Sequence, residues 1–131
     1  PYKSAGEMSG NNLFIDTNIV IYFLSGDDTL TELLEGKSIF ISVITKLELL
    51  SYGELSSRDQ QRLEKFLDEC SIVDLNTNVQ QTAVNIRKKY KLKLPDSIIV
   101  ASAQYVDLPL ISADKSLRSI QEGSIIYYEK K

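Results

Sequence analysis

The chain has 131 residues, 43% of them hydrophobic and 25% charged, which is typical of a single globular domain with one core. It contains no histidine and one cysteine, which excludes histidine-based catalysis, an intrachain disulfide and a zinc site built from cysteines. The formal net charge of −3 argues against a generic nucleic-acid binder, so any contact with nucleic acid must be local or supported by bound cations.

The start of the chain and its hydropathy give two further expectations. Residues 1–7 are polar and unpatterned and precede Met8, so we interpret them as an added or disordered leader and expect one domain over residues 8–131. No apolar run approaches the roughly 20 residues that span a bilayer, and no charged-then-apolar signal sequence opens the chain. We therefore expect a cytoplasmic protein that makes no membrane contact.

Short apolar runs alternate with helical patterns along the domain. The expected strands cover residues 13–15, 38–43, 72–75, 108–112 and 125–128. The expected helices cover residues 19–24, 29–35, 45–50, 57–70, 78–90, 96–106 and 115–120. Periodicity does not separate helix from strand over residues 96–106, but their length, their alanines and the preceding Pro95 favour a buried helix. The alternation predicts an α/β fold, a parallel sheet covered on both faces.

Acidic residues stand where the expected strands end, which is where such sheets bind ligands. Asp16 directly follows the first strand, and Asp114 lies just beyond the fourth. Glu48 falls in the first turn expected for the helix after the second strand, and Asp96 begins the long apolar helix. Taken singly, the aspartates also suit helix caps, and Glu48 suits a capping box opened by Thr45. Caps do not explain a carboxylate against an apolar helix, so the joint pattern favours a functional cluster.

Four motifs resemble the PIN domain family in their order and spacing. They are residues 13–19 (LFIDTNI), 45–49 (TKLEL), 94–101 (LPDSIIVA) and 111–114 (ISAD). The resemblance covers essentially everything after Met8 and is strongest to the small VapC-like proteins. It implies a three-layer α/β/α fold with a central, mainly parallel sheet of about five strands. One departure is that residues 115–117 (KSL) lack the aromatic side chain expected after the fourth acidic motif.

The resemblance also implies a function, that of a metal-dependent endoribonuclease. The family's acidic cluster, which binds Mg²⁺ or Mn²⁺, carries over to Asp16, Glu48, Asp96 and Asp114, and Asn18 carries over as a supporting catalytic residue. In a chain without histidine, a metal-activated water is the most available nucleophile for a phosphodiester, and hard divalent ions take oxygen ligands. The likeness to VapC-like proteins further implies a toxin that forms a homodimer and is held inactive by a cognate antitoxin protein.

An acidic site repels RNA, so the substrate needs cations nearby. Residues 87–93 (RKKYKLK) bring five cations into seven residues just before Asp96, and Lys115 and Arg118 follow Asp114. We interpret five lysines as substrate-binding residues: Lys88, Lys89, Lys91, Lys93 and Lys115. The alternative is a solvated helix end whose cations complement the helix dipole.

Two other functions stay open at this point. A PIN-fold RNA-binding or scaffold protein would hold metal weakly and show little or no nuclease activity, so a measured metal affinity separates it from the nuclease. A phosphate-transfer receiver or hydrolase on a doubly wound sheet also gathers aspartates at strand ends. That class pairs acidic residues after the first strand, whereas Asp16 stands alone, and it ends a central strand on an aspartate, whereas Asp74 precedes the end of its expected strand.

Overall fold

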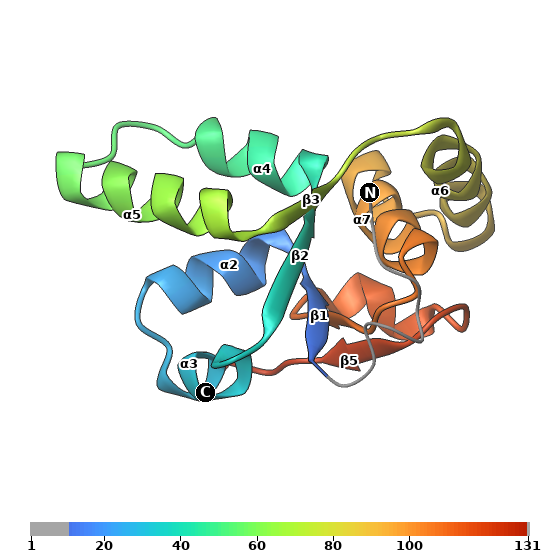
Figure 1. The fold of residues 1–131 in the computed structure, drawn as a ribbon. Coiled ribbons are helices and arrows are strands. Elements are labelled where there is room, and N and C mark those ends of the chain that lie inside the picture. The colour runs from blue at the N-terminus through green and yellow to red at the C-terminus, as the bar shows by residue number, and fades with distance from the viewer. Residues whose placement is uncertain (1–10, 131) are drawn as a thin grey trace.

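The computed structural model describes residues 11–130, and its centre is a five-stranded parallel sheet (Figure 1). The strands are β1 (Asn12–Ile15), β2 (Ser38–Ser42), β3 (Ser71–Val73), β4 (Leu110–Ser112) and β5 (Ile125–Tyr127). Their order across the sheet is β3-β2-β1-β4-β5, and every neighbouring pair is parallel. All five strands therefore end at the same edge, which confirms the predicted α/β fold class. The predicted leader over residues 1–7 and the start at Met8 lie outside the described residues.

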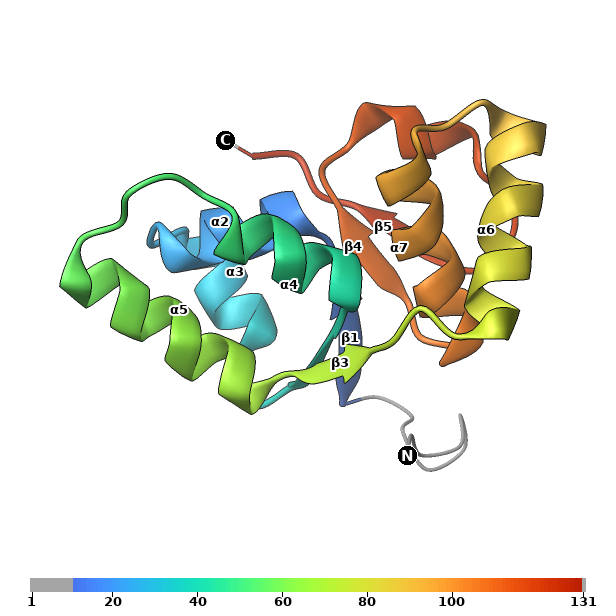
Figure 2. The same ribbon diagram turned by 90° about the horizontal axis from the view of Figure 1, so that it is seen from above.

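Helices cover both faces of this sheet. They are α2 (Thr17–Leu24), α3 (Asp28–Leu34), α4 (Val43–Leu50), α5 (Ser57–Glu69), α6 (Thr77–Tyr90), α7 (Leu94–Tyr105) and the 3-10 helix η1 (Lys115–Ser119). Figures 1 and 2 show α2, α3, α4 and α5 on one side of the strands and α6 with α7 on the other. This is the three-layer arrangement expected from the sequence. Among the described residues, none of the helices has the length and hydropathy to cross a membrane.

The core consists of two apolar clusters, one on each face of the sheet. Successive strand residues alternate between them, so Phe14 packs with α6 and α7 while Ile15 packs with α2, α3 and α5, and both are fully buried. Burying one such side chain contributes about 1.5–3 kcal/mol, which explains why these short strands are apolar without interruption. Helix α7 is buried along residues 97–103, as its apolar sequence predicts. The buried stretch begins at Ser97, directly after Asp96.

Candidate functional site

Asp16 joins the end of β1 to the start of α2. It is the N-cap of α2, and its Oδ1 accepts a hydrogen bond from the Ile19 backbone N–H at 3.0 Å. Its Oδ2 accepts a short hydrogen bond from the Ser112 hydroxyl at the end of β4. Burial is the main cause that raises the pKa of Asp16, which is 4% exposed, and the charges of Asp114 and Glu48 raise it further against these hydrogen bonds. One side chain thus serves as a cap and belongs to an acidic cluster.

Ser112 connects two of the acidic positions, and sequence reasoning missed it. The side chain is fully buried; its hydroxyl donates to Asp16 and its Oγ accepts from the Asp114 backbone N–H at 3.0 Å. It therefore holds the Asp16 carboxylate and the Asp114 backbone in a fixed relation. The available signal was a polar residue at the last position of a buried strand, two residues before an aspartate.

Replacing this hydroxyl is expected to destabilise the fold. Ser112→Ala removes a donor from the buried Asp16 carboxylate and an acceptor from the Asp114 N–H, which we expect to cost about 1–3 kcal/mol of unfolding free energy in urea titrations. The matched control is Ser102→Ala, because Ser102 is equally buried but bonds only the Ile98 carbonyl within α7. An equal loss of unfolding free energy in the two variants would contradict the role of Ser112 in joining Asp16 to the Asp114 backbone.

Glu48 is held by the first residue of α2. Its Oε1 accepts a hydrogen bond from the Thr17 hydroxyl at 2.6 Å, and the Thr17 and Thr45 hydroxyl oxygens lie 3.0 Å apart. The predicted capping box is wrong, because the Ser42 side chain caps α4 and the helix begins at Val43. Glu48 consequently lies in the second turn of α4, not the first, and reaches toward β1 instead of toward its own helix end. Thr17 is the second residue that sequence reasoning missed.

Asp96 lies half-buried in the first turn of α7 and does not cap it. The N-cap is Lys93, which makes no side-chain cap hydrogen bond, so the interpretation of Asp96 as a cap is wrong. Burial first, then the charge of Asp114 and a hydrogen bond shared with its side chain, raise the pKa of Asp96 to about 6. The charges of Glu48 and Asp16 act in the same direction.

Asp114 is both a cap and a member of this cluster. Its Oδ1 accepts hydrogen bonds from the Ser116 backbone N–H at 2.9 Å and from the Ser116 hydroxyl at 2.8 Å, which fixes the start of η1. The same side chain contacts Asp96, so a carboxyl group from the β4 end and one from α7 meet directly. Such a contact between two acids is favourable when a proton lies between them or a cation compensates their charge.

The four carboxylates thus come from four segments of the chain, and the charges of Glu48 and Asp114 raise the pKa of both Asp16 and Asp96. Within residues 11–130 no three of them form a ready-made metal cage. The donor set nevertheless fits a hard divalent cation, because it offers only oxygen ligands and a formal charge that two such ions would neutralise. Burial and the charge of Asp114 raise the pKa of Asp96, so a cation bound beside these two carboxylates would relieve their repulsion.

Three other predicted site residues lie within three positions of a cluster member in the chain. Asn18 is exposed on α2, and within the described part of the chain no hydrogen bond connects it to Asp16. Lys93 is the N-cap of α7, three residues before Asp96, and Lys115 begins η1 directly after Asp114. Both lysines are exposed. They are therefore close in sequence to the cluster and accessible to a ligand.

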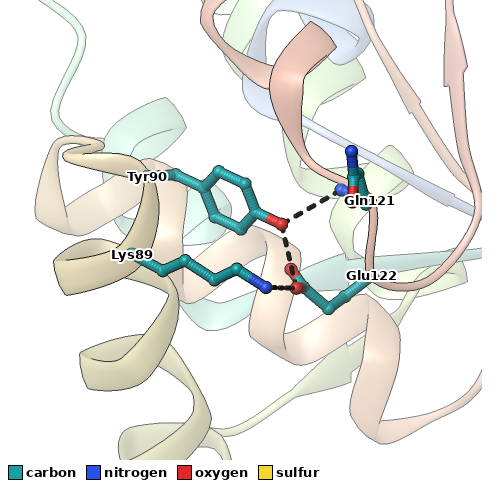
Figure 3. A network of polar contacts seen from close by, with 4 residues as sticks. All are labelled: Lys89, Tyr90, Gln121 and Glu122. Atoms are coloured by element: carbon teal, nitrogen blue, oxygen red, sulfur yellow. Dashed lines mark hydrogen bonds and ion pairs between the residues drawn. The ribbon is translucent and has the colours of Figure 1, made fainter.

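Lys89 differs from the other predicted lysines because an acid binds it. Its Nζ lies 2.5 Å from Glu122 Oε1, and the Tyr90 hydroxyl donates to the same oxygen at 2.8 Å (Figure 3). The Tyr90 oxygen also accepts from the Gln121 backbone N–H at 3.3 Å. Hydrogen bonding to Glu122 raises the pKa of Lys89. Lys89 thus ties α6 to the loop before β5, whereas Lys88 in the last turn of α6 and Lys91 at its C-cap are exposed.

A second feature is an apolar groove between α2, α4 and α5. Its volume is about 290 Å³, and its lining combines the mainly apolar side chains of Ile21, Leu24, Leu49, Tyr52, Leu55 and Leu63 with the polar side chains of Ser25, Asp59 and Arg62. Tyr52 is 51% exposed and Leu55 37% exposed, and Leu47 and Leu50 add exposed apolar surface on α4. The groove lies on the face of the sheet opposite α6 and α7.

Comparisons with known proteins agree with this geometry. The family model described as PIN domain matches residues 13–123. The structure is similar to a toxin–antitoxin complex from Klebsiella pneumoniae, at 34% identity and a TM-score of 0.78, over 89% of this chain and 98% of that chain. It is also similar to VapBC2 from Rickettsia felis bound to a promoter DNA fragment, at 20% identity and a TM-score of 0.78, over 90% and 99% of the chains. A comparison with curated protein sequences gives no match.

Proposed function

The chain belongs to the PIN domain family, and from this premise we propose that it is a Mg²⁺- or Mn²⁺-dependent endoribonuclease and the toxin of a toxin–antitoxin pair. The observation that carries the proposal is the coupled carboxylate cluster at the carboxyl edge of a parallel sheet. Its members are Asp16, Glu48, Asp96 and Asp114. With no histidine in the chain, this cluster is the acid–base and ligand chemistry that the site offers to a phosphodiester.

Each carboxylate would hold the metal in a way set by its surroundings. When bound, Mg²⁺ or Mn²⁺ would supply a water of lowered pKa and neutralise charge on the phosphoryl oxygens. Asp16 keeps a fixed orientation through Ser112 and the Ile19 N–H, and Glu48 keeps one through Thr17. Asp96 would hold the metal from the first turn of α7, and a bound cation would offset the burial and the acidic charges that raise its pKa to about 6.

The charge around the cluster supports an RNA substrate. The exposed lysines at the end of α6 and the starts of α7 and η1 offset the acidic edge, and we assign phosphate contacts to Lys88, Lys91, Lys93 and Lys115. Lys89 belongs to the same proposed surface, although its ammonium group also forms an ion pair with Glu122. We assign Asn18 a supporting role beside Asp16, since it is exposed in the first turn of the same helix.

The proposal is tested by cleavage of a panel of structured RNAs, including tRNAs, with Mg²⁺, with Mn²⁺ and with EDTA. Metal affinity is measured in parallel by calorimetry. Cleavage that requires metal supports the nuclease. An absence of both cleavage and metal binding favours the alternative of a PIN-fold RNA-binding or scaffold protein. Metal binding without cleavage of any RNA in the panel would contradict general ribonuclease activity.

We place the antitoxin partner on the apolar groove between α2, α4 and α5. Its exposed apolar side chains suit a partner segment with apolar side chains, and the similar structure from Klebsiella pneumoniae is a toxin–antitoxin complex. A homodimer is the other occupant to consider, because the same helices expose apolar surface. Light scattering of the isolated chain distinguishes the two. A dimer mass would indicate that a second copy can fill the groove, and a monomer mass would leave it to the partner.

Introducing a charge into this groove is expected to weaken binding of the partner. Tyr52→Glu places a carboxylate against the apolar lining, and burying it in the interface should cost at least about 2 kcal/mol, or roughly 30-fold in Kd. The measurement is co-purification and titration with the candidate antitoxin protein. Val84→Glu is the matched control, since Val84 is 47% exposed on α6, away from the groove. Equal affinities for both variants would contradict this placement.

A further inference from the structure

Arg118 is stacked on a tyrosine beside the carboxylate cluster. Its guanidinium carbon lies 4.2 Å from the centroid of the Tyr127 ring, which is a close cation–π contact. Both residues line a shallow groove of about 430 Å³ between η1 and β5. The stacking restrains an otherwise flexible side chain, so the guanidinium N–H groups are held in place before any ligand arrives.

The sheet register places this pair next to the cluster. In the pairing of β4 with β5, Tyr127 is the partner of Ser112, the residue that bonds both Asp16 and the Asp114 backbone. Register partners in a parallel sheet present their side chains on the same face. Arg118 approaches from the other direction, since Asp114 caps the 3-10 helix that carries it. The sheet register thus relates Tyr127 to the cluster, and the short helix that Asp114 caps relates Arg118 to it.

The charge of Arg118 is available to a ligand. Among residues 11–130 the ion pair that is present joins Lys89 to Glu122, and no carboxylate of these residues binds Arg118. The guanidinium is exposed on η1, and the ring beneath it is a π-face that leaves its N–H edges unoccupied. A planar group with several parallel donors matches a phosphate better than a lysine does, because it can make two hydrogen bonds at once.

We propose that Arg118, backed by Tyr127, binds an RNA phosphate neighbouring the one that is cut. This inference rests on the proposed ribonuclease function and assigns that function a specific phosphate contact. The groove between η1 and β5 gives the strand a path away from the acidic edge, and Arg118 supplies the positive charge at its start. Tyr127 acts through Arg118 by holding its guanidinium in place.

The test is the salt dependence of RNA binding. A fluorescein-labelled single-stranded RNA is titrated by anisotropy at several salt concentrations, with Ca²⁺ in place of Mg²⁺ and a gel to verify that the RNA stays intact. We expect Arg118→Gln to weaken binding roughly 5- to 20-fold at low salt and to reduce the slope of log K against log salt by about 0.7, the value for one phosphate contact on a single strand. Arg118→Lys should keep the slope and recover part of the affinity.

A structural role alone would not change this slope. Tyr127→Leu should weaken affinity with the slope unchanged, because the positive charge remains but loses its support. The matched control is Arg58→Gln, an exposed arginine on α5, which should bind RNA as the unmodified protein does. In cleavage assays, Arg118→Gln should raise KM more than it lowers kcat.

These experiments distinguish a failure of the Arg118 contact from a failure of the proposed ribonuclease function. If the unmodified protein neither binds nor cuts RNA, the ribonuclease proposal fails and the Arg118 contact fails with it. If the unmodified protein cuts RNA while Arg118→Gln keeps its affinity and its salt slope, the ribonuclease stands and the Arg118 contact is wrong. An equal loss of RNA affinity in Arg118→Gln and Arg58→Gln would also overturn the proposed Arg118 contact, because the loss would then reflect the net charge of the protein.

Discussion

Asp96→Asn is expected to lower the rate of metal-dependent RNA cleavage at least about 100-fold, although the amide keeps the shape of the side chain. Outer residues that only orient metal ligands already cost 10–100-fold when they are replaced, so loss of a ligand should cost more. Asp96 is the member of the cluster on which the other carboxylates converge, because Asp114, Glu48 and Asp16 all raise its pKa. Its amide carries no charge to offer a divalent cation.

The measurement is the initial rate on an RNA that the unmodified protein cuts, with Mn²⁺ or Mg²⁺ and with EDTA. Asp68→Asn is the matched control, because Asp68 is exposed on α5, away from the sheet edge. Asp96→Asn should unfold no earlier than the unmodified protein in EDTA, since it removes a repulsive charge. An activity within about threefold of the unmodified protein, with the fold intact, would exclude Asp96 from the metal site.

The fold could be predicted from the sequence because its signals are local. The strands have apolar centres, and both faces of β1 are covered, as the burial of Phe14 and Ile15 shows. Helix α7 followed from length, alanine content and Pro95, although periodicity alone did not identify it. The start of α4 was placed too late because both Ser42 and Thr45 suit a cap, and burial of Thr45 against Thr17, not its propensity, decides between them.

The proposed site was only partly predictable, because some of its residues contact partners that lie far away in the sequence. Aspartates at strand ends are recognisable because parallel strands finish at one edge, and Asp16 and Asp114 follow that rule. The hydroxyl groups that orient the carboxylates are not recognisable in the sequence. Ser112 lies 96 residues from Asp16, and Thr17 lies 31 residues from Glu48. Serine and threonine are too common for such pairs to stand out. The bond from Lys89 to Glu122 spans 33 residues and was missed in the same way.

In EDTA, the contribution of Asp96 to the stability of the folded protein is expected to fall as the pH rises from about 4 to about 6. An unperturbed aspartate has a pKa of about 3.9, whereas the pKa of Asp96 is raised to about 6 in the fold. Between these values the folded state binds more protons than the unfolded chain, so its stability is full below the lower value and is lost as the pH rises through the higher one. Asp16 shifts in the same direction. Because Asp96 is only half-buried, solvent screening limits its share to about 1 kcal/mol.

Divalent ions are expected to reverse this loss above pH 6, because they bind the deprotonated carboxylates and offset their mutual repulsion. At 100 times Kd, an ion that binds only the folded state adds about 2.7 kcal/mol, a larger effect than the repulsion it relieves. The measurement is urea unfolding between pH 4 and 7 with EDTA, Mg²⁺ or Mn²⁺. Asp96→Asn should flatten the pH dependence in EDTA and reduce the gain from metal together, since one carboxyl group causes both. A variant that lost one effect and kept the other would show that the acid responsible for the pH dependence is not the one that holds the ion.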